Sequence, residues 1–558
     1  MNARDRNAGI AWCGLLLSCV CWAAWTRPPH SGPHIFDPAI GYVDVTVASE
    51  GILLDAADGG EIHFTLDGSA PDRNDPIANG RTIRMPDTRR SERLMRHRTS
   101  IQQRDPLIGL PNAVVVRAAQ WIGGAHGPVR TRTVPVRHHT LPIVALTADA
   151  GAFFDPDSGI YVIGNAIFRS DGIPVRTFPK DHRWWKYPGN FQMRGEEWER
   201  SVHVEALGAD GTPLWDGDAR ARIHGNNTRG FPQHALRITL PEPCAYAWTS
   251  GTAGQKSVIL RAAGNDQADS FMRDLVQHRM CTGLPFVTTG GRSVVMYLNG
   301  AYWGVHHVRD RMDNNELARR YGGSAKRYTV LEDRLKLYKG DEAQIKHFSR
   351  FLTWSERWDA SAPAFVDSVS RYLDVDGFLA YMAAQLILGN MDWPDQNVRY
   401  WRWTGVADTV PGPHDGRWHM MMGDSDMGLG YSAPVTTDPF AHVERHNGPI
   451  ARLYKALMRS DGLRERMLAE VERLLAGPLP PEACSPLLMR HTHNSRPRWR
   501  TMWRVGVSRP PWLSGSATWR CYAPLPGIGL PLCTLTRRPI CPFTRPCSNS
   551  SATGSNSS

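Results

Sequence analysis

The chain has 558 residues, 41% of them hydrophobic, which is enough for two or more globular domains. Its formal net charge of +11 would favour a nucleic-acid partner if the charge were spread evenly. However, the segment from Ser485 to Ser558 holds ten arginines and no Asp, Glu or Lys, which leaves the rest of the chain nearly neutral. This distribution excludes a generally basic nucleic-acid-binding protein, and we expect no specific nucleic-acid partner.

Residues 1–35 have the composition of a targeting segment. Arg4 and Arg6 precede an uncharged run that is long enough for a signal peptide or a short membrane anchor. Because a basic flank stays inside, we expect the rest of the chain to be exported to the cell envelope or the outside of the cell. LLSC, which ends at Cys19, loosely resembles a lipoprotein cleavage box. A cleaved signal, an uncleaved membrane anchor and a lipid anchor remain open.

Residues 36–140 are predicted to form a small all-β sandwich. Runs such as YVDVTVA and AVVVRAAQW alternate as strands do and are separated by Gly, Pro and Asp turns. The segment 81–104 is arginine-rich and poor in aliphatic residues, which indicates a solvated loop. In EIHFTLDGSAP, Asp67 and Gly68 supply a turn, so Asp67 is interpreted as a turn former. This run resembles the module at the C-terminal end of chitobiases and β-hexosaminidases, which implies a carbohydrate-associated context.

Residues 141–480 show a mixed pattern of strands and helices. Strands are expected in LPIVALTAD, on both sides of the GNNTRGFP turn, and in SVILRA. A hairpin is expected to turn at Asn299 and Gly300. A helix capped by Asp269 or Ser270 should follow SVILRA and end before Gly283.

A second helix is expected to begin after Asp374 and to end at Gly389, directly before the run GNMDWPDQN. Strands are predicted at 398–403 and 417–422, and the second of them leads into GDSDMG. Two acidic loops therefore follow a helix and a hairpin. This order is the local topology that a kinase site needs.

The candidate site consists of Asp392, Asn397, Asp424 and Asp426. In kinase-like folds an aspartate orients the hydroxyl to be phosphorylated, an asparagine five residues later holds Mg²⁺, and an aspartate after the next hairpin holds Mg²⁺ again. Asp392 and Asn397 have this spacing. Mg²⁺ prefers oxygen ligands, which Asn397, Asp424 and Asp426 would supply to Mg²⁺ or Mn²⁺. Each of these residues taken alone also suits a turn-capping role.

Several blocks of the chain resemble the CotH family of atypical kinases. They are RIHGNNTRGFP, SFMRDLVQHRM, YLNGAYWGVHHVRDRMDNNELARRYG, VDGFLAYMAAQLILGNMDWPDQN and WHMMMGDSDMGLG, and they span most of residues 141–435. The resemblance implies an α+β fold, in which a divergent protein-kinase-like domain follows the β-sandwich. It also implies transfer of the γ-phosphoryl group of ATP to Ser or Thr of secreted or cell-surface proteins. Asp392 then becomes the catalytic aspartate, Asn397 and Asp424 metal ligands, and Asp426 their partner.

One position departs from the family pattern. After the RIHG turn, family members usually carry a lysine suited to nucleotide phosphates, whereas this chain has Pro232-Gln233-His234-Ala235. Histidine is mostly neutral at physiological pH and cannot replace a permanent ammonium. Other basic residues are therefore expected to hold the nucleotide. The candidates are Arg229, Arg237 and Arg273, with Lys256 as a further alternative.

The departure leaves an alternative function open. A catalytically impaired kinase-like protein of the cell envelope, whose sandwich binds cell-wall glycan, would also fit these residues. Residues 481–558 are predicted to lack regular structure, because no amphipathic period is present. An arginine-rich tail for anionic polymers is one reading of this segment. A frame-shifted C-terminus is the reading that its missing acidic residues and lysines favour.

Overall fold

The computed structural model describes residues 35–480, except 49, 58, 79, 89–92, 103–108, 167–182, 250–252 and 432–436, together with 517–521 and 533–537. The predicted leader lies outside the described residues, apart from its last residue. The chain divides into two compact units. Unit 1 contains Met1–Ser91 and Asn112–Val136, and unit 2 contains Glu92–Pro111 and Arg137–Ser558.

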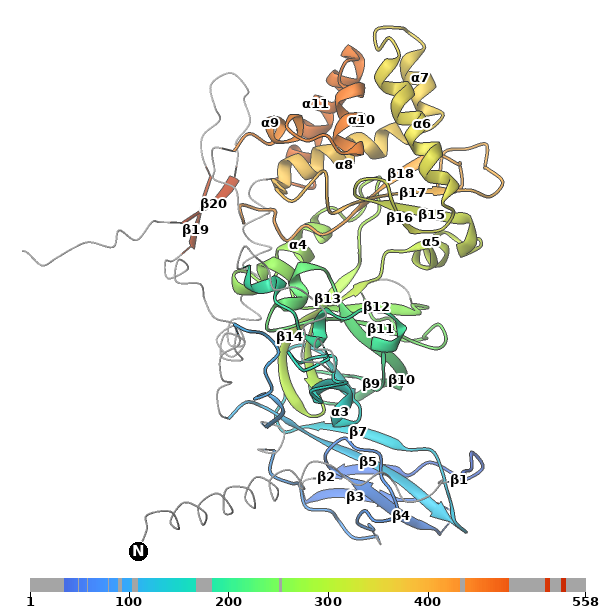
Figure 1. The fold of residues 1–558 in the computed structure, drawn as a ribbon, viewed down its shortest axis with the longest axis vertical. Coiled ribbons are helices and arrows are strands. Elements are labelled where there is room, and N and C mark those ends of the chain that lie inside the picture. Colours follow the sequence, from blue (N-terminus) through green and yellow to red (C-terminus); the bar gives the residue numbers. More distant parts are fainter. Residues whose placement is uncertain are drawn as a thin grey trace, which may run out of the picture. The chain divides into compact units, whose positions relative to one another are not determined.

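Unit 1 contains two sheets, whose strands pair antiparallel except for β1, which pairs with β6 in parallel (Figure 1). The larger sheet has the order β1-β6-β5-β4, with β7 also paired to β5, and β2 pairs with β3 in the smaller one. The strands are β1 (Ile35–Phe36), β2 (Asp44–Ala48), β3 (Gly51–Asp55), β4 (Glu61–Thr65), β5 (Ala113–Ile122), β6 (Ala125–His126) and β7 (Arg130–Pro135). Side chains from both sheets, including Ile52, Leu54, Phe64 and Val116, form one hydrophobic core. Two sheets around a shared core agree with an all-β unit, while the likeness to the chitobiase module stays a prediction.

Part of the segment predicted as a solvated loop is buried. The Thr99 hydroxyl donates to the carbonyl of Pro232 at 2.7 Å, and the Ser100 hydroxyl donates to the carbonyl of Gly230 at 2.6 Å. Both side chains are buried, and both belong to unit 2. The expectation for 81–104 is therefore wrong at this point, because composition cannot reveal hydrogen bonds to a distant turn.

The first half of unit 2 is a closed barrel of seven strands in the order β10-β11-β12-β14-β13-β8-β9. Its strands are β8 (Ile143–Thr147), β9 (Arg200–Leu207), β10 (Pro213–His224), β11 (Ala235–Thr239), β12 (Ser257–Arg261), β13 (Gly291–Leu298) and β14 (Ala301–Asp310). Ile223, Leu236, Leu260 and Val308 lie in one row across four strands and are buried. Their neighbours in sequence must point to the opposite face, because side chains alternate along a strand.

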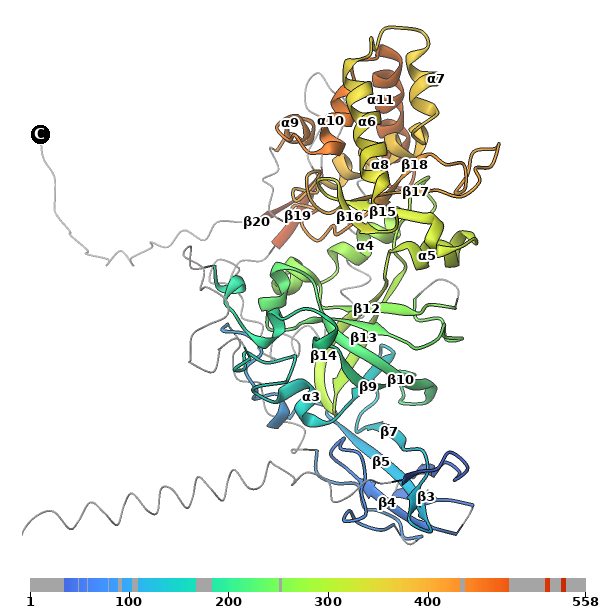
Figure 2. The same cartoon turned by 45° about the vertical axis from the view of Figure 1, so that its right-hand side comes forward.

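The second half of unit 2 is a four-stranded antiparallel sheet with helices packed against it. The sheet order is β16-β15-β17-β18, formed by β15 (Tyr328–Glu332), β16 (Lys336–Lys339), β17 (Val398–Trp403) and β18 (Trp418–Met422). Figures 1 and 2 both show α6, α8, α10 and α11 together on the side of the sheet away from the barrel. The described residues contain nine α-helices: α3 (Ala150–Phe154), α4 (Arg273–Met280), α5 (Asn314–Tyr321), α6 (Ala343–Arg357), α7 (Phe365–Ser370), α8 (Val375–Leu388), α9 (Pro439–Glu444), α10 (Pro449–Leu457) and α11 (Asp461–Ala476).

The sheet is buried on both faces. Tyr400 and Met420 join the large core formed with the helices, whereas Trp401 and Met421 join a smaller cluster with Leu317 of α5. The alternation along β17 and β18 divides these side chains between the two cores. This double burial holds the end of β18 rigidly, and the candidate aspartates follow directly after it.

Most predicted elements of unit 2 are confirmed. Asn299 and Gly300 have φ values of 46° and 77° and form the turn between β13 and β14. Helix α8 follows Asp374 and ends at Gly389, whose φ of 59° is typical of a helix C-terminus. The prediction that Asp269 or Ser270 caps α4 is wrong. Helix α4 begins at Arg273, and the backbone amide of Arg273 donates to the carboxylate of Asp266.

The predicted tail, residues 481–558, lies outside the described residues except for two strands. β19 (Ala517–Cys521) and β20 (Cys533–Arg537) pair antiparallel, which contradicts the expectation that this segment lacks regular structure. Both strands carry threonine and other residues with high strand propensity. Separately, no helix among the described residues has the length and apolar character needed to cross a bilayer.

Candidate functional site

The loop between α8 and β17 is anchored from three sides. The indole Nε1 of buried Trp393 donates to the hydroxyl of Tyr381 on α8 at 2.9 Å. The carboxylate of Asp395 accepts a hydrogen bond from the amide of Gly448 at 2.6 Å. His442 Nε2 lies 2.6 Å from the carbonyl oxygen of Trp393. These contacts fix the loop that carries Asp392 and leave its carboxylate partly exposed.

Asp392 and Asn397 contact each other directly. The side-chain amide of Asn397 donates to Asp392 Oδ2 at 2.8 Å and to the Asp392 carbonyl at 3.2 Å. Among the described residues, no hydrogen bond engages the Asn397 Oδ1 atom, so this oxygen remains available to a metal ion. Burial raises the pKa of Asp392, and the charges of Asp424 and Asp333 add to the rise, while the Asn397 hydrogen bond opposes it.

A single side chain connects the two acidic loops. The Oδ1 atom of Asn390 accepts from the amide of Asp392 at 3.3 Å, and its Nδ2 donates to the carbonyl of Asp424 at 3.3 Å. The first loop ends at Val398 and the second begins after Met422. Because Val398 and Met422 are paired on β17 and β18, the two loops also lie next to each other at this point. Asp392 and Asp424, which are 32 positions apart in the sequence, are therefore held at one place.

Asp424 and Asp426 converge on one cation, the guanidinium of Arg261. Arg261 Nη2 lies 2.6 Å from Asp424 Oδ1 and 2.9 Å from Asp426 Oδ2. Arg261 is the last residue of β12, and its side chain is 18% exposed. Burial lowers its pKa, but the three neighbouring carboxylates outweigh this effect and raise the pKa above the usual value. Arg261 is therefore always charged here.

Asp426 is almost fully enclosed by donors. Its Oδ2 accepts from the backbone amide of Asn265 at 2.7 Å, and its Oδ1 accepts from Asn265 Nδ2 at 3.1 Å. Its side chain is 1% exposed, whereas that of Asp424 is 28% exposed. Burial and the nearby Asp424 charge raise the pKa of Asp426, while Arg261 and Asn265 oppose this. Asp426 thus holds the 261–265 segment in place, and Asp424 presents the more accessible carboxylate.

A third carboxylate, Asp274 on α4, supports the loop from below. Its Oδ1 accepts from the amide of Ser425 at 3.1 Å, and its Oδ2 forms an ion pair with Arg309. Arg261 Nε lies 3.5 Å from the same Oδ2. Burial raises the pKa of Asp274, but the guanidiniums of Arg309 and Arg261 reverse this and hold it well below the usual value. Asp274 is consequently charged and positions Ser425 between the two candidate aspartates.

The three arginines predicted to bind nucleotide have different surroundings. Arg229 is buried and donates to backbone carbonyls, among them that of Phe191 at 2.8 Å, so it holds the turn between β10 and β11 together. Arg273 is 1% exposed and pairs with Asp266 and, at 2.9 Å, with Asp269. The assigned phosphate contacts of Arg229 and Arg273 have no geometric support, because both guanidiniums are engaged inside the protein.

Arg237 is better placed than the other two. It pairs with Glu199 at 3.0 Å and lies opposite Ile259 of β12, two positions before Arg261. Residues two apart on a strand share a face, so Arg237 and Arg261 lie on the same outer side of the barrel. Lys256 is exposed beyond the other end of β12, roughly 16 Å from Arg261 along an extended chain. Among the residues that the structure describes, Arg261 is therefore the basic residue that contacts Asp424 and Asp426.

The residue at the position of the missing lysine lies in a buried cluster of aromatic side chains. His234 is fully buried between Tyr161 and Phe191, with ring centroids at 4.5 and 5.0 Å. Burial lowers its pKa to about 3, so the ring stays neutral. Gln233 is also buried and donates to the carbonyl of Trp303 at 2.8 Å. Our interpretation that the charge lost at position 234 would weaken a phosphate clamp is not supported, because this side chain does not face the carboxylates.

The oxygen donors fit a divalent cation in chemical type. Asn397 Oδ1 and the accessible carboxylate of Asp424 are hard oxygen ligands of the kind that Mg²⁺ and Mn²⁺ prefer. Arg261 already places one positive charge between Asp424 and Asp426. Within the described part of the chain, no group of three or more His, Cys, Asp or Glu side chains is arranged to hold a metal ion. The fit therefore depends on Asn397, on Asp424 and on phosphate oxygens.

Sequence reasoning missed three residues of this site. Arg261, Gly264 and Asn265 belong to the run RAAGND, which forms the wall opposite Asp424 and Asp426. The available signal was a strand that ends in an arginine and runs into a Gly-Asn turn. Only the three-dimensional pairing shows that this turn faces the aspartates, which follow it by about 160 positions.

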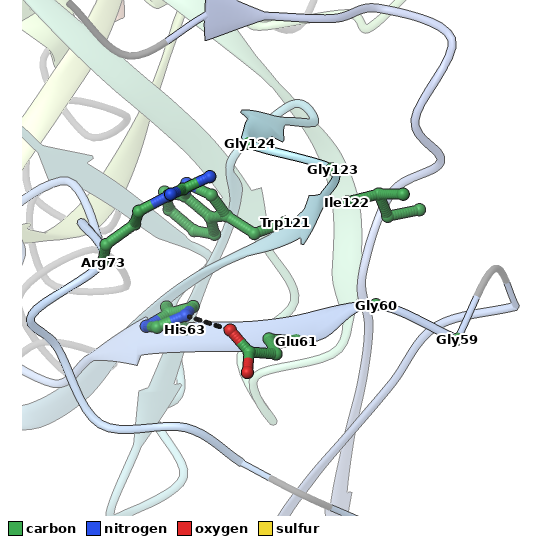
Figure 3. A pocket seen from close by; sticks show the side chains of 9 residues that line it. All are labelled: Gly59, Gly60, Glu61, His63, Arg73, Trp121, Ile122, Gly123 and Gly124. Carbon is green, nitrogen blue, oxygen red and sulfur yellow. Dashed lines mark ion pairs between the residues drawn. The ribbon is translucent and has the colours of Figure 1, made fainter.

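Unit 1 contains a separate pocket with a volume of about 450 Å³ (Figure 3). Glycines contribute much of its lining, and the Glu61 carboxylate lies 3.5 Å from His63 Nε2. Figure 3 shows the Arg73 side chain extending toward the ring of Trp121. The full lining is Gly59, Gly60, Glu61, His63, Arg73, Trp121, Ile122, Gly123 and Gly124. The pocket thus offers an anionic and a cationic group, but none of the predicted site residues.

Comparison with known proteins identifies the second unit. The family described as CotH kinase protein matches residues 221–506, just over half of the chain. The match includes both acidic loops and Arg261, and it extends past residue 480, where the domain was predicted to end. A comparison with curated proteins gives no match. The mixed α/β unit, with its joined acidic loops, is that of a kinase-like protein, and the chain belongs to the CotH kinase family.

Proposed function

We propose that this protein is an exported atypical kinase that transfers the γ-phosphoryl group of ATP to Ser or Thr of secreted or cell-surface proteins. The observation that carries the proposal is the connection of Asp392 and Asp424 through the side chain of Asn390. Phosphoryl transfer needs one carboxylate for the acceptor hydroxyl and another beside the metal-bound phosphates. The family match supports the same chemistry.

In this proposal, Asp392 accepts a hydrogen bond from the incoming hydroxyl and thereby orients it. Asn397 holds the Asp392 carboxylate through its amide nitrogen and turns its own oxygen toward the metal position. Asp424 supplies the accessible carboxylate, and Asp426 fixes the strand end behind it. Mg²⁺ or Mn²⁺ bound with ATP would neutralise the charge that develops on the phosphates. The contribution of the protein is positioning and electrostatics rather than covalent chemistry.

Export is proposed from the leader composition alone. Residues 1–35 carry a basic start and a long apolar run, which would deliver the kinase to the cell envelope and could retain it at the membrane. The acceptors are then secreted or surface proteins with accessible Ser or Thr. Locating the protein in fractionated cells, with and without the first 35 residues, tests this part independently of activity.

The kinase proposal is tested by ATP transfer with Mg²⁺ or Mn²⁺ on a panel of Ser-rich acceptors. Asp392→Asn removes the proton acceptor while preserving the shape, and it should lower the rate by about a hundredfold or more. Asp376→Asn is the matched control, because Asp376 is 83% exposed and its one ion pair within the described part of the chain is with Arg466 at the surface. Equal rates for the two variants would reject the role of Asp392.

A glycan-binding envelope protein without kinase activity is the alternative function. The pocket of unit 1 favours it, because Arg73 and Glu61 could donate to and accept from sugar hydroxyls. Calorimetry separates the two proposals. The kinase binds ATP with Mg²⁺ in unit 2, whereas the alternative protein binds cell-wall glycan and shows no heat with nucleotide.

A further inference from the structure

We propose that Arg261 acts as an exchangeable internal cation, which neutralises Asp424 and Asp426 before metal binds and then passes to the nucleotide phosphates. This inference rests on the proposed kinase function. Arg261 would take the place of the missing lysine as a phosphate-binding residue, and its guanidinium would compete with the metal ion.

The position of the Arg261 guanidinium is that of a cation between two anions. One nitrogen, Nη2, contacts an oxygen of Asp424 at 2.6 Å and an oxygen of Asp426 at 2.9 Å. These carboxylates would otherwise repel each other in a largely buried place, where charge interactions are stronger than in water. A divalent cation that binds Asp424 Oδ1 competes with this contact, because the guanidinium occupies the same oxygen.

The guanidinium has spare hydrogen-bonding capacity. Among the described residues, no hydrogen bond or ion pair engages Arg261 Nη1, and the side chain retains 18% of its exposure. A guanidinium presents its donors as a planar fork that matches phosphate oxygens. Arg261 can therefore exchange a carboxylate for a phosphate without a large movement of the backbone.

Arg309, a neighbour of Arg261 in this cluster, has a purely structural role. Arg309 is buried, pairs with Asp274 and donates to the Thr289 hydroxyl. Asp274 therefore keeps a charge partner even if Arg261 moves. The structural task in this cluster belongs to Arg309, and Arg261 is left to pair with Asp424 and Asp426.

The charge balance favours the exchange. Asp274 and Asp424 face the guanidiniums of Arg309 and Arg261, and Asp392 lies close enough for the charge of Asp424 to act on it, so carboxylates that attract a divalent cation gather here. Once such a cation is present, its charge and that of Arg261 together attract an anion. The site would thus bind a nucleotide together with its divalent cation more tightly than it binds the cation alone or the nucleotide alone.

The test compares binding of Mn²⁺ alone and of Mn²⁺ with a non-hydrolysable ATP analogue, both by calorimetry. Arg261→Gln should bind Mn²⁺ alone about tenfold more tightly and the analogue with Mn²⁺ about tenfold more weakly than the parent protein. Arg452→Gln is the control, because Arg452 pairs with Glu356 at 2.7 Å, away from the site, and both affinities should stay as in the parent. Unchanged or weaker Mn²⁺ binding by folded Arg261→Gln would overturn the proposal.

A measurement on the parent protein covers the case in which Arg261→Gln does not fold. Modification of Arg261 by phenylglyoxal, mapped by mass spectrometry, should increase with Mn²⁺ alone and decrease with Mn²⁺ plus analogue. An extent of modification that Mn²⁺ does not change would refute the exchange. If the parent protein binds neither Mn²⁺ nor the analogue, the proposed function fails, and this inference fails with it. If the parent binds both and only the Arg261 results are negative, the inference alone is rejected.

Discussion

Gly264 lies so close to Asp426 that a Cβ atom on the glycine would overlap the Oδ2 atom of the carboxylate. The same Cβ would also press on Arg261 Nη2. In addition, Gly264 has a φ of +61°, a conformation that other residues adopt with strain. Space and backbone geometry therefore both require glycine at this position.

Gly264→Ala should lower the free energy of unfolding by about 2–4 kcal/mol, from backbone strain and steric overlap together, and should abolish binding of the ATP analogue with Mn²⁺. Gly283→Ala separates the two causes. Gly283 also has a positive φ, +87°, but no atom lies within 4 Å of its added Cβ. This control should cost only about 1 kcal/mol and leave binding intact. Urea unfolding and calorimetry provide the measurements, and equal losses in both variants would contradict the overlap.

His234→Lys tests whether the family lysine can be restored. Because position 234 is enclosed by Tyr161 and Phe191, an ammonium there would be buried without a partner. We expect a loss of several kcal/mol in stability and no gain in nucleotide affinity. His138→Lys makes the same change at an exposed position and should be nearly neutral. A stable His234→Lys protein with tighter ATP binding would show that this side chain can reach the phosphates.

The fold and the catalytic loops could be predicted from local patterns, but the opposite wall of the site could not. Asp392, Asn397 and Asp424 follow a helix C-cap and a hairpin, whose signals are short-range and strong. Arg261 joins them because the end of β12 contacts the loop after β18, and no local pattern encodes this contact. Arg229 and Arg273 are basic and near the expected motifs, but a sequence does not show that their guanidiniums contact groups of the protein itself, among them the Phe191 carbonyl and the Asp266 carboxylate.

His419 should make stability depend on pH. It lies between Asp374, 3.3 Å away, and Asp415, 3.1 Å away. Burial lowers the pKa of His419, but the two carboxylates outweigh burial and raise it above 6.5. For a raised histidine, the stabilisation is complete below the unfolded-state pKa and disappears as pH rises through the folded-state pKa.

His419→Gln should therefore destabilise the protein more at pH 6 than at pH 9, as measured by thermal unfolding in a matched series of buffers. The effect matters for the site because Asp374 precedes α8, the helix that leads to Asp392. His138→Gln, at an exposed position, should show no such dependence. A destabilisation by His419→Gln that is the same at both pH values would mean that its charge contributes nothing.

The same substitution at Asp424 and Asp426 should have different consequences. Asp424 is the more exposed of the two, so Asp424→Asn should change the melting temperature little while removing binding of Mn²⁺ with the ATP analogue. Asp426 accepts from Asn265 through both oxygens and is 1% exposed. An amide nitrogen in place of either oxygen would face a donor, so Asp426→Asn should lose about 1–3 kcal/mol of stability as well as binding. Unfolding curves measure the stability of both variants, and calorimetry measures their binding of Mn²⁺ with the ATP analogue. If Asp426→Asn were as stable as the parent while Asp424→Asn unfolded, the division between a metal ligand and a structural anchor would have to be reversed.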